Sequence, residues 1–209
     1  MIGGRAGMLP RGICRLAVGL SVVGGIVVSY HGRESGELLD LASRPENASL
    51  TFTIRDYRAS DFDRLWQIDQ LCFPSGIAYS RMELESFISR RNAITRVAAV
   101  PEDENSDDAA GISRVVGYVI AHPIRRKYGR ILTLDIVPEA RRYGLGTRLM
   151  SDCEQRLRAL GCTDMYLETA VDNEPALRLY RKLGYEVLRT LPGYYASHAL
   201  DAFLMGKRL

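Results

Sequence analysis

The sequence lacks the patterns that metal-binding and disulfide-rich secreted proteins carry. It holds only four cysteines and three histidines in 209 residues. The cysteines stand at positions 14, 72, 153 and 162, form no C-x-x-C pair, and share no zinc-ligand spacing with a histidine. We therefore expect no metal site. We also expect reduced, packed thiols, which are typical of a cytoplasmic protein.

The chain also lacks a strong charge imbalance and any internal repeat. Its 28 basic and 25 acidic side chains leave a formal net charge of +3. That charge is too small to indicate direct nucleic-acid binding. Basic residues cluster locally instead, at residues 125–130 and at Arg141 and Arg142. A chain of this length can bury one sizeable core but is short for two domains.

No apolar run reaches the roughly 20 residues of a membrane-spanning helix. The strongest candidate, "LAVGLSVVGGIVVSY" at residues 16–30, follows three arginines and contains three glycines and two serines. Three interpretations of residues 1–48 stay open: a signal or membrane anchor, a flexible extension, or an upstream stretch added by a wrong start codon. We favour the last two, so we expect no membrane partner and a folded domain over residues 49–209.

The rest of the sequence predicts one mixed α/β domain. The alternating stretch "LTFTIRDY" at residues 50–57 indicates a half-buried strand, and the whole pattern predicts the order β-α-α-β-β-β-α-β-α-β-β. The acidic stretch 101–111 favours a solvated hairpin connection over a calcium loop. Residues that cap or end helices mark the helix boundaries: Ser60 or Asp61, Ser80 with Glu83, Asp172 or Asn173, Gly161 and Gly184.

The stretch "DIVPEARRYGLGTRLM" at residues 135–150 joins an apolar strand to a helix. A strand–helix–strand crossover makes its two strands parallel, and ligands bind beyond the carboxyl ends of such strands. Gly144 and Gly146 at the helix start, with Arg141 and Arg142, suit a pyrophosphate. A tight turn without a ligand is the alternative. The P-loop pattern is absent, and Leu149 stands where the dinucleotide fingerprint needs glycine.

Four motifs carry a resemblance to a known family. "RRYGLG" matches the R/Q-x-x-G-x-G/A signature of the GNAT acetyltransferases. "LETAVDNEPALRLYRKLGYEV", "GYYASHALDAFLM" and "CFPSGIAYS" resemble segments of the RimI-type N-terminal acetyltransferases. The resemblance covers roughly residues 50–208. It implies an α/β GNAT fold, with a mixed, mostly antiparallel twisted sheet, a central parallel strand pair and about four helices.

The resemblance also implies an activity: transfer of acetyl from acetyl-CoA to a protein N-terminal amine, directly in a ternary complex. It implies Glu168 as general base and Tyr180 as general acid, and a peptide acceptor held by Phe73, Pro74, Tyr194 and Tyr195. The cofactor residues that it implies are Ile136, Val137, Arg141, Arg142, Tyr143, Gly144, Leu145, Gly146, Thr147 and Asn173.

Other interpretations of these residues stay open. Glu168 is also compatible with an exposed carboxylate at a strand end, and the helical spacing of Tyr180 alone favours a core position. Tyr194 and Tyr195 fit either loop packing or peptide binding. Thr169 and Ala170 depart from the family pattern, which puts the peptide preference in doubt.

The acceptor and the catalytic activity also have alternatives. A ribosomal protein is one candidate acceptor, and lysine or small-molecule amines are others. A non-catalytic acetyl-CoA-binding module is the alternative to an enzyme. The sequence leaves the oligomeric state open.

Overall fold

The computed structural model describes residues 15–17, 51–73, 77–100, 115–124, 127–195 and 200–209. The acidic connection 101–111 and nearly all of residues 1–48 lie outside the described residues. Within the described ranges, no helix is long and apolar enough to span a membrane. The strands are β1 (Arg15–Ala17), β2 (Thr53–Asp56), β3 (Ile94–Ala99), β4 (Val115–Ile124), β5 (Tyr128–Ile136), β6 (Asp164–Ala170), β7 (Glu186–Tyr195) and β8 (Leu200–Arg208). The helices are α1 (Phe62–Cys72), α2 (Arg81–Ile88), α3 (Leu145–Ala159) and α4 (Glu174–Lys182).

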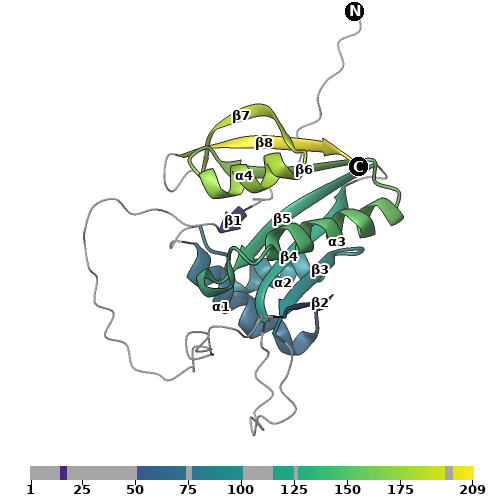
Figure 1. Ribbon diagram of the computed structural model, residues 1–209, viewed down its shortest axis with the longest axis vertical. Helices are drawn as coiled ribbons and strands as arrows, with labels where there is room; N and C mark the ends of the chain where they lie inside the picture. Colours follow the sequence, from purple (N-terminus) through teal and green to yellow (C-terminus); the bar gives the residue numbers. More distant parts are fainter. Residues whose placement is uncertain (1–14, 18–50, 74–76, 101–114, 125–126, 196–199) are drawn as a thin grey trace, which may run out of the picture.

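The strands form one mixed sheet in the order β2-β3-β4-β5-β6-β8-β7 (Figure 1). Along this order, neighbouring strands are antiparallel except β5 and β6, which α3 connects; β1 adds a second parallel pairing with β5. This confirms the predicted fold, its central parallel pair and the order of elements from residue 50 onward. The short strand β1 was not predicted.

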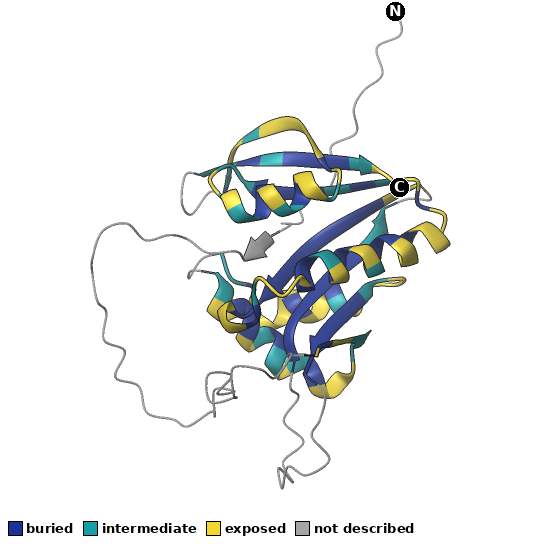
Figure 2. Ribbon diagram, viewed as in Figure 1, coloured by how far each residue is buried: buried dark blue, intermediate teal, exposed yellow. Residues whose placement is uncertain are grey.

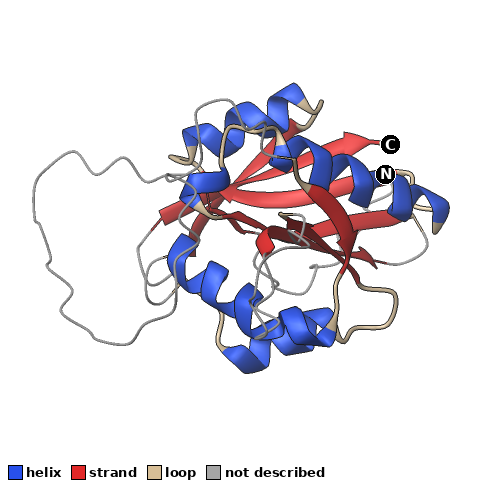
Figure 3. Ribbon diagram, turned by 60° about the horizontal axis from the view of Figure 1, so that its bottom comes forward, coloured by secondary structure: helices blue, strands red, loops and turns tan. Residues whose placement is uncertain are grey.

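Helices cover both faces of the sheet (Figure 3). The two faces follow from the alternation of side chains along β5. A side chain at Gly129 would collide with Met165 of β6 and Leu157 of α3, so this position faces α3. The helix α1 contacts β4 and β5 from the other side. The buried positions run along the middle strands, between the two helix layers (Figure 2).

Most of the predicted helix caps are confirmed. Ser80 and Glu83 form the capping box of α2, and the Asn173 side chain caps α4. Gly161 and Gly184 follow α3 and α4 with φ of +88° and +87°, values that glycine adopts without strain.

Asp61 differs from the prediction. It stands at the start of α1 but does not cap that helix with its side chain. Its carboxylate instead accepts a hydrogen bond from the Arg58 amide at 2.8 Å and pairs with Arg55 at 2.7 Å. The Arg55 ion pair therefore turns the side chain away from the amides that it was expected to cap.

The last hairpin consists of β7 and β8. The strand β7 runs to Tyr195, with an irregular register between Leu191 and Tyr195. Gly193 absorbs the irregularity with φ of +59°, and its amide donates to Asp201 Oδ1 at 2.7 Å. Pairing with β8 resumes at Tyr195, which lies opposite Leu200.

The parallel pair β5–β6 separates toward its carboxyl end. Register pairs run only from Tyr128–Asp164 to Arg130–Tyr166. Beyond them, Thr133–Asp135 of β5 pair in parallel with Arg15–Ala17 of β1, which also contacts β6. The N-terminal strand therefore occupies the opening between β5 and β6 (Figure 1).

Candidate active site

The carboxyl end of β5 forms the floor of the candidate site. Ile136 and Val137 are both buried. The Val137 amide donates to the Val116 carbonyl at 2.9 Å and is thereby held on the β4 side. Successive residues of a strand direct their amides to opposite edges, so the Ile136 amide faces the edge that β4 does not cover. Of the two predicted residues, Ile136 is the better placed to offer an amide to a ligand.

The Ile136 carbonyl anchors the loop that follows. It accepts a hydrogen bond from Arg141 Nε at 2.9 Å and a weaker contact from Cys72 Sγ at 3.6 Å. The side chain of Arg141 is therefore directed back toward the strand end and α1. The predicted acceptor-side residue Phe73 follows Cys72 and is half-buried, so the end of α1 lies beside the end of β5. Pro74 lies outside the described residues.

The glycine loop opens the helix α3. Gly144 is its N-cap residue, with φ of +76°, and a side chain there would meet no atom within 4 Å. The amides of the first turn, which include Leu145, Gly146 and Thr147, have no partner inside a helix and carry its partial positive charge. Gly146 packs closely on α4, because a Cβ there would lie 2.9 Å from the end of the Leu179 side chain, which would have to shift.

Two further predicted residues stand on the outside of this loop. Arg142 and Tyr143 are exposed, and the Tyr143 ring packs on Phe52 with 5.6 Å between ring centroids. The open space above Gly144, the first-turn amides of α3 and the exposed Arg142 together fit an anionic group such as a pyrophosphate.

Glu168 of β6 is the acidic residue of the site. It is only 5% exposed, so its interpretation as an ordinary exposed carboxylate is wrong. Arg130 of β5, 4% exposed, pairs with it: Nη2 lies 2.7 Å from Oε1, and Nε donates to Oε2 at 3.1 Å. Arg130 Nη2 also reaches the Tyr194 hydroxyl at 3.4 Å. The structure thus gathers the predicted residues Glu168 and Tyr194 around one guanidinium.

Sequence reasoning did not identify Arg130 as part of the site. A signal was present, because Arg130 is a charged residue directly before the apolar run "ILTLDIV". The sequence pattern places it both in the local basic cluster at residues 125–130 and at the start of a strand, and it names no partner for the charge.

The remaining predicted residues have clear structural positions. Tyr180 of α4 is fully buried, with its ring 5.7 Å from that of Tyr185, so the core position that its spacing favours is confirmed. Asn173 Oδ1 accepts from the Ala176 amide at 3.3 Å as the cap of α4. Tyr195 is buried, and its ring meets that of Tyr194 edge to face at 5.2 Å. The described ranges contain no group of three or more His, Cys, Asp and Glu side chains suited to a metal ion.

These features define a class of enzyme. A strand-end amide directed away from β4, an anion-binding glycine loop and a buried carboxylate together suit the transfer of an acyl group from a phosphate-bearing donor. The chain belongs to the acetyltransferase (GNAT) family, whose model matches residues 62–185. It is therefore an N-acetyltransferase, with acetyl-CoA as the acetyl donor.

Three known proteins illustrate the similarity. The N-alpha-acetyltransferase of Sulfurisphaera tokodaii is 27% identical over 170 residues, which span 76% of this chain and 93% of that protein. The structure of Ard1 from Thermoplasma volcanium is similar with a TM-score of 0.64 at 25% identity, over 76% of this chain and 97% of that one. Arabidopsis thaliana NAA60, solved in complex with acetyl-CoA, has a TM-score of 0.64 at 24% identity, over 76% of this chain and all of that one.

Proposed function

We propose that this enzyme acetylates the α-amino group of protein N-termini. The buried Glu168 carries the proposal, because it stands where β5 and β6 separate and shares Arg130 with Tyr194 of the β7–β8 hairpin. A carboxylate between the strand edge that would bind acetyl-CoA and a hairpin that carries tyrosines is placed to accept a proton from the amine of a bound peptide. The relative from Sulfurisphaera tokodaii, named an N-alpha-acetyltransferase, supports the same acceptor class.

Residues of the β5–α3 connection would hold the donor. Acetyl-CoA supplies an acetyl thioester at one end and a pyrophosphate within its longer part. The amides of residues 145–147, with Arg142 nearby, would bind the pyrophosphate. The Ile136 amide would stabilise the negative charge that develops on the acetyl oxygen. Val137 contributes by fixing the strand end through its hydrogen bond to Val116.

The transfer step needs a base and an acid. An α-amino group has a pKa of about 8, so much of it is protonated near neutral pH. Glu168 would first accept that proton, directly or through one water, which frees the lone pair of the nitrogen to bond to the acetyl carbon. The carbon–sulfur bond then breaks as the phenol of Tyr180 donates a proton to the leaving thiolate, and the second proton of the nitrogen would restore the phenol.

The three cysteines within the described residues support direct transfer without an acyl-enzyme. Burial, aided by the negative charge of Asp135, raises the pKa of the Cys72 thiol to about 12. Burial also raises the pKa values of Cys153 and Cys162. A thiol that stays protonated at neutral pH is a poor nucleophile. We therefore infer that amine and acetyl-CoA react in a ternary complex. The free thiols of the described cysteines fit a reaction in the cytoplasm, where thiols stay reduced.

The acceptor peptide would approach from the side of Tyr194, Tyr195 and the segment that begins at Phe73. A ribosomal protein N-terminus is one candidate acceptor. The deciding experiment incubates the full chain with acetyl-CoA and matched peptides, half with free and half with blocked N-termini, some containing lysine. Acetylation confined to free N-termini is expected, whereas modification of blocked lysine peptides or of small amines alone would overturn the proposal.

In the same assay, Glu168→Gln separates an enzyme from a binding module. We expect the variant to lose about 100-fold or more in kcat while its Kd for acetyl-CoA stays within about twofold. A variant with unchanged turnover would remove Glu168 from the chemistry.

A further inference from the structure

Arg130 is a fully charged side chain in a buried place. It is 4% exposed, and it lies on the face of β5 opposite the Gly129 position, which faces α3. Glu168 shares that face of the sheet, since its carboxylate meets the guanidinium. Burial of a charge is unfavourable unless it is paired and hydrogen-bonded, so the pair needs good geometry to persist.

Arg130 contacts both oxygens of the Glu168 carboxylate. Arg130 Nη2 approaches one oxygen of Glu168 at 2.7 Å, while Nε approaches the other at 3.1 Å. Two parallel contacts from a planar guanidinium restrict rotation of the carboxylate more than a single ammonium contact does. The orientation of Glu168 is thereby set by a residue of the neighbouring strand.

The position of the pair along the sheet gives it a functional setting. Arg130 and Tyr166 are the last register pair before β5 and β6 separate, and Glu168 stands two residues beyond, on the separating part. The guanidinium therefore spans the start of the opening. Tyr194 of β7 contributes a third contact at 3.4 Å, from the hairpin proposed to meet the acceptor.

We propose that Arg130 is a positioning residue that orients the Glu168 carboxylate for the acceptor amine at the point where β5 and β6 separate. This inference rests on the proposed role of Glu168 as base. A purely structural ion pair is the competing explanation, and it predicts a loss of stability without a specific loss of turnover. The two explanations differ in how substitutions at Arg130 and Glu168 combine.

A double-mutant cycle on the full chain tests the proposal. Arg130→Gln is expected to lower kcat about 10- to 100-fold, with the Kd for acetyl-CoA within about twofold of the parent. Arg130→Lys keeps the charge but only one contact, and should recover part of that loss. In the Glu168→Gln background, Arg130→Gln should lower kcat by less than about twofold, because no carboxylate is left to orient. The exposed Arg189 of β7 provides the matched control, Arg189→Gln, which should leave kcat unchanged.

Equal losses from Arg130→Gln in both backgrounds would overturn the proposal, as would unchanged kcat with a lower melting temperature. Should Arg130→Gln fail to fold, the Arg130→Lys variant is compared in the two backgrounds, where the carboxylate or its amide still has a partner. The cycle is run on whichever amine the wild-type chain acetylates. Failure of the N-terminal acceptor proposal is thus visible in the wild type alone and separate from the result for Arg130.

Discussion

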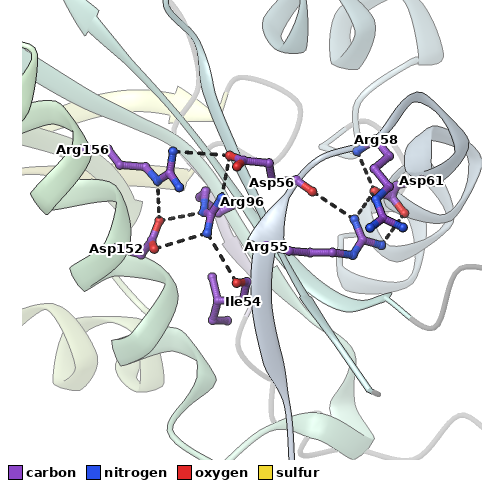
Figure 4. Close-up of polar contacts among 8 residues, drawn as sticks. All are labelled: Ile54, Arg55, Asp56, Arg58, Asp61, Arg96, Asp152 and Arg156. Carbon is purple, nitrogen blue, oxygen red and sulfur yellow. Dashed lines mark hydrogen bonds and ion pairs between the residues drawn. The ribbon is translucent and has the colours of Figure 1, made fainter. Parts of the chain in front are cut away.

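Arg96 of β3 and Asp152 of α3 form an ion pair at 2.7 Å that joins the sheet to the helix carrying the glycine loop (Figure 4). The Arg96 side chain is only 6% exposed. It also meets Asp56 of β2 at 2.5 Å, and Arg156 joins both carboxylates from the next turn of α3. Three elements far apart in the sequence are thus held at one buried guanidinium.

From this network we expect that removal of its two carboxylates lowers the free energy of unfolding by different amounts. Asp152→Ala leaves Arg96 short of its partner on α3, and we expect a loss of about 2–3 kcal/mol in the free energy of unfolding. Asp56→Ala is the matched control, because its side chain is 73% exposed and solvent screens the pair. It should cost less than about 1 kcal/mol. Urea unfolding of both variants measures the difference, and equal costs would contradict this assignment.

His122 of β4 predicts a loss of stability in mild acid. Burial, with the charges of Arg90 and Arg130, lowers its pKa from 6.5 to about 4, and its Nδ1 has no hydrogen-bond partner among the described residues. The folded chain therefore holds His122 neutral. The part of the free energy of unfolding that depends on a neutral His122 is fully present above pH 6.5, and it is lost as the pH falls from there toward 4.

The measurement for His122 is the difference between wild type and His122→Gln. Allowing for its partial exposure, we expect the wild type to lose about 1–2 kcal/mol more than the variant between pH 7 and pH 4.5. Urea unfolding at several pH values follows this difference directly. Parallel curves for the two proteins would show that His122 does not carry the effect.

Asn173 caps the helix α4, and this structural role can be measured separately from its implied contact with the cofactor. Its side chain caps α4, so Asn173→Ala should cost about 1 kcal/mol in stability. Asn173→Asp keeps a capping oxygen and should cost little. If the amide also contacts acetyl-CoA, both variants should bind it more weakly. Thermal unfolding and calorimetric titration report the two roles separately.

The strand β1 predicts competition with the donor. Residues 15–17 pair with Thr133–Asp135, the part of β5 that leads to Ile136, where the acetyl group is proposed to bind. Leu16→Pro removes a backbone donor and disfavours strand pairing, so it should tighten acetyl-CoA binding by a few-fold. Leu16→Ala serves as the control, because it shortens the side chain but keeps the backbone N–H that proline removes. Weaker binding by Leu16→Pro would show that β1 supports the site.

Short-range features of the fold were predictable from the sequence. The capping box at Ser80 and Glu83, the cap at Asn173 and the glycines that end α3 and α4 depend on neighbours within a few residues. The glycine loop before α3 is local in the same way, and the family motifs add its expected ligand. Asp61 shows the limit of this reasoning, because an ion pair with Arg55 redirected a side chain that was well suited to cap α1.

The sequence by itself determined the type and order of the elements from residue 50 onward, since hydrophobic periodicity and capping act locally along the chain. Only the tertiary structure decided that Arg130 would pair with Glu168, 38 residues away, and that Arg96 would reach Asp152 across 56 residues. It likewise decided that β1 would lie in the opening beside β5. A buried charge must be paired, and its partner is the opposite charge that the packed strands and helices bring next to it. Those neighbours are set only when the sheet and its helices have packed together.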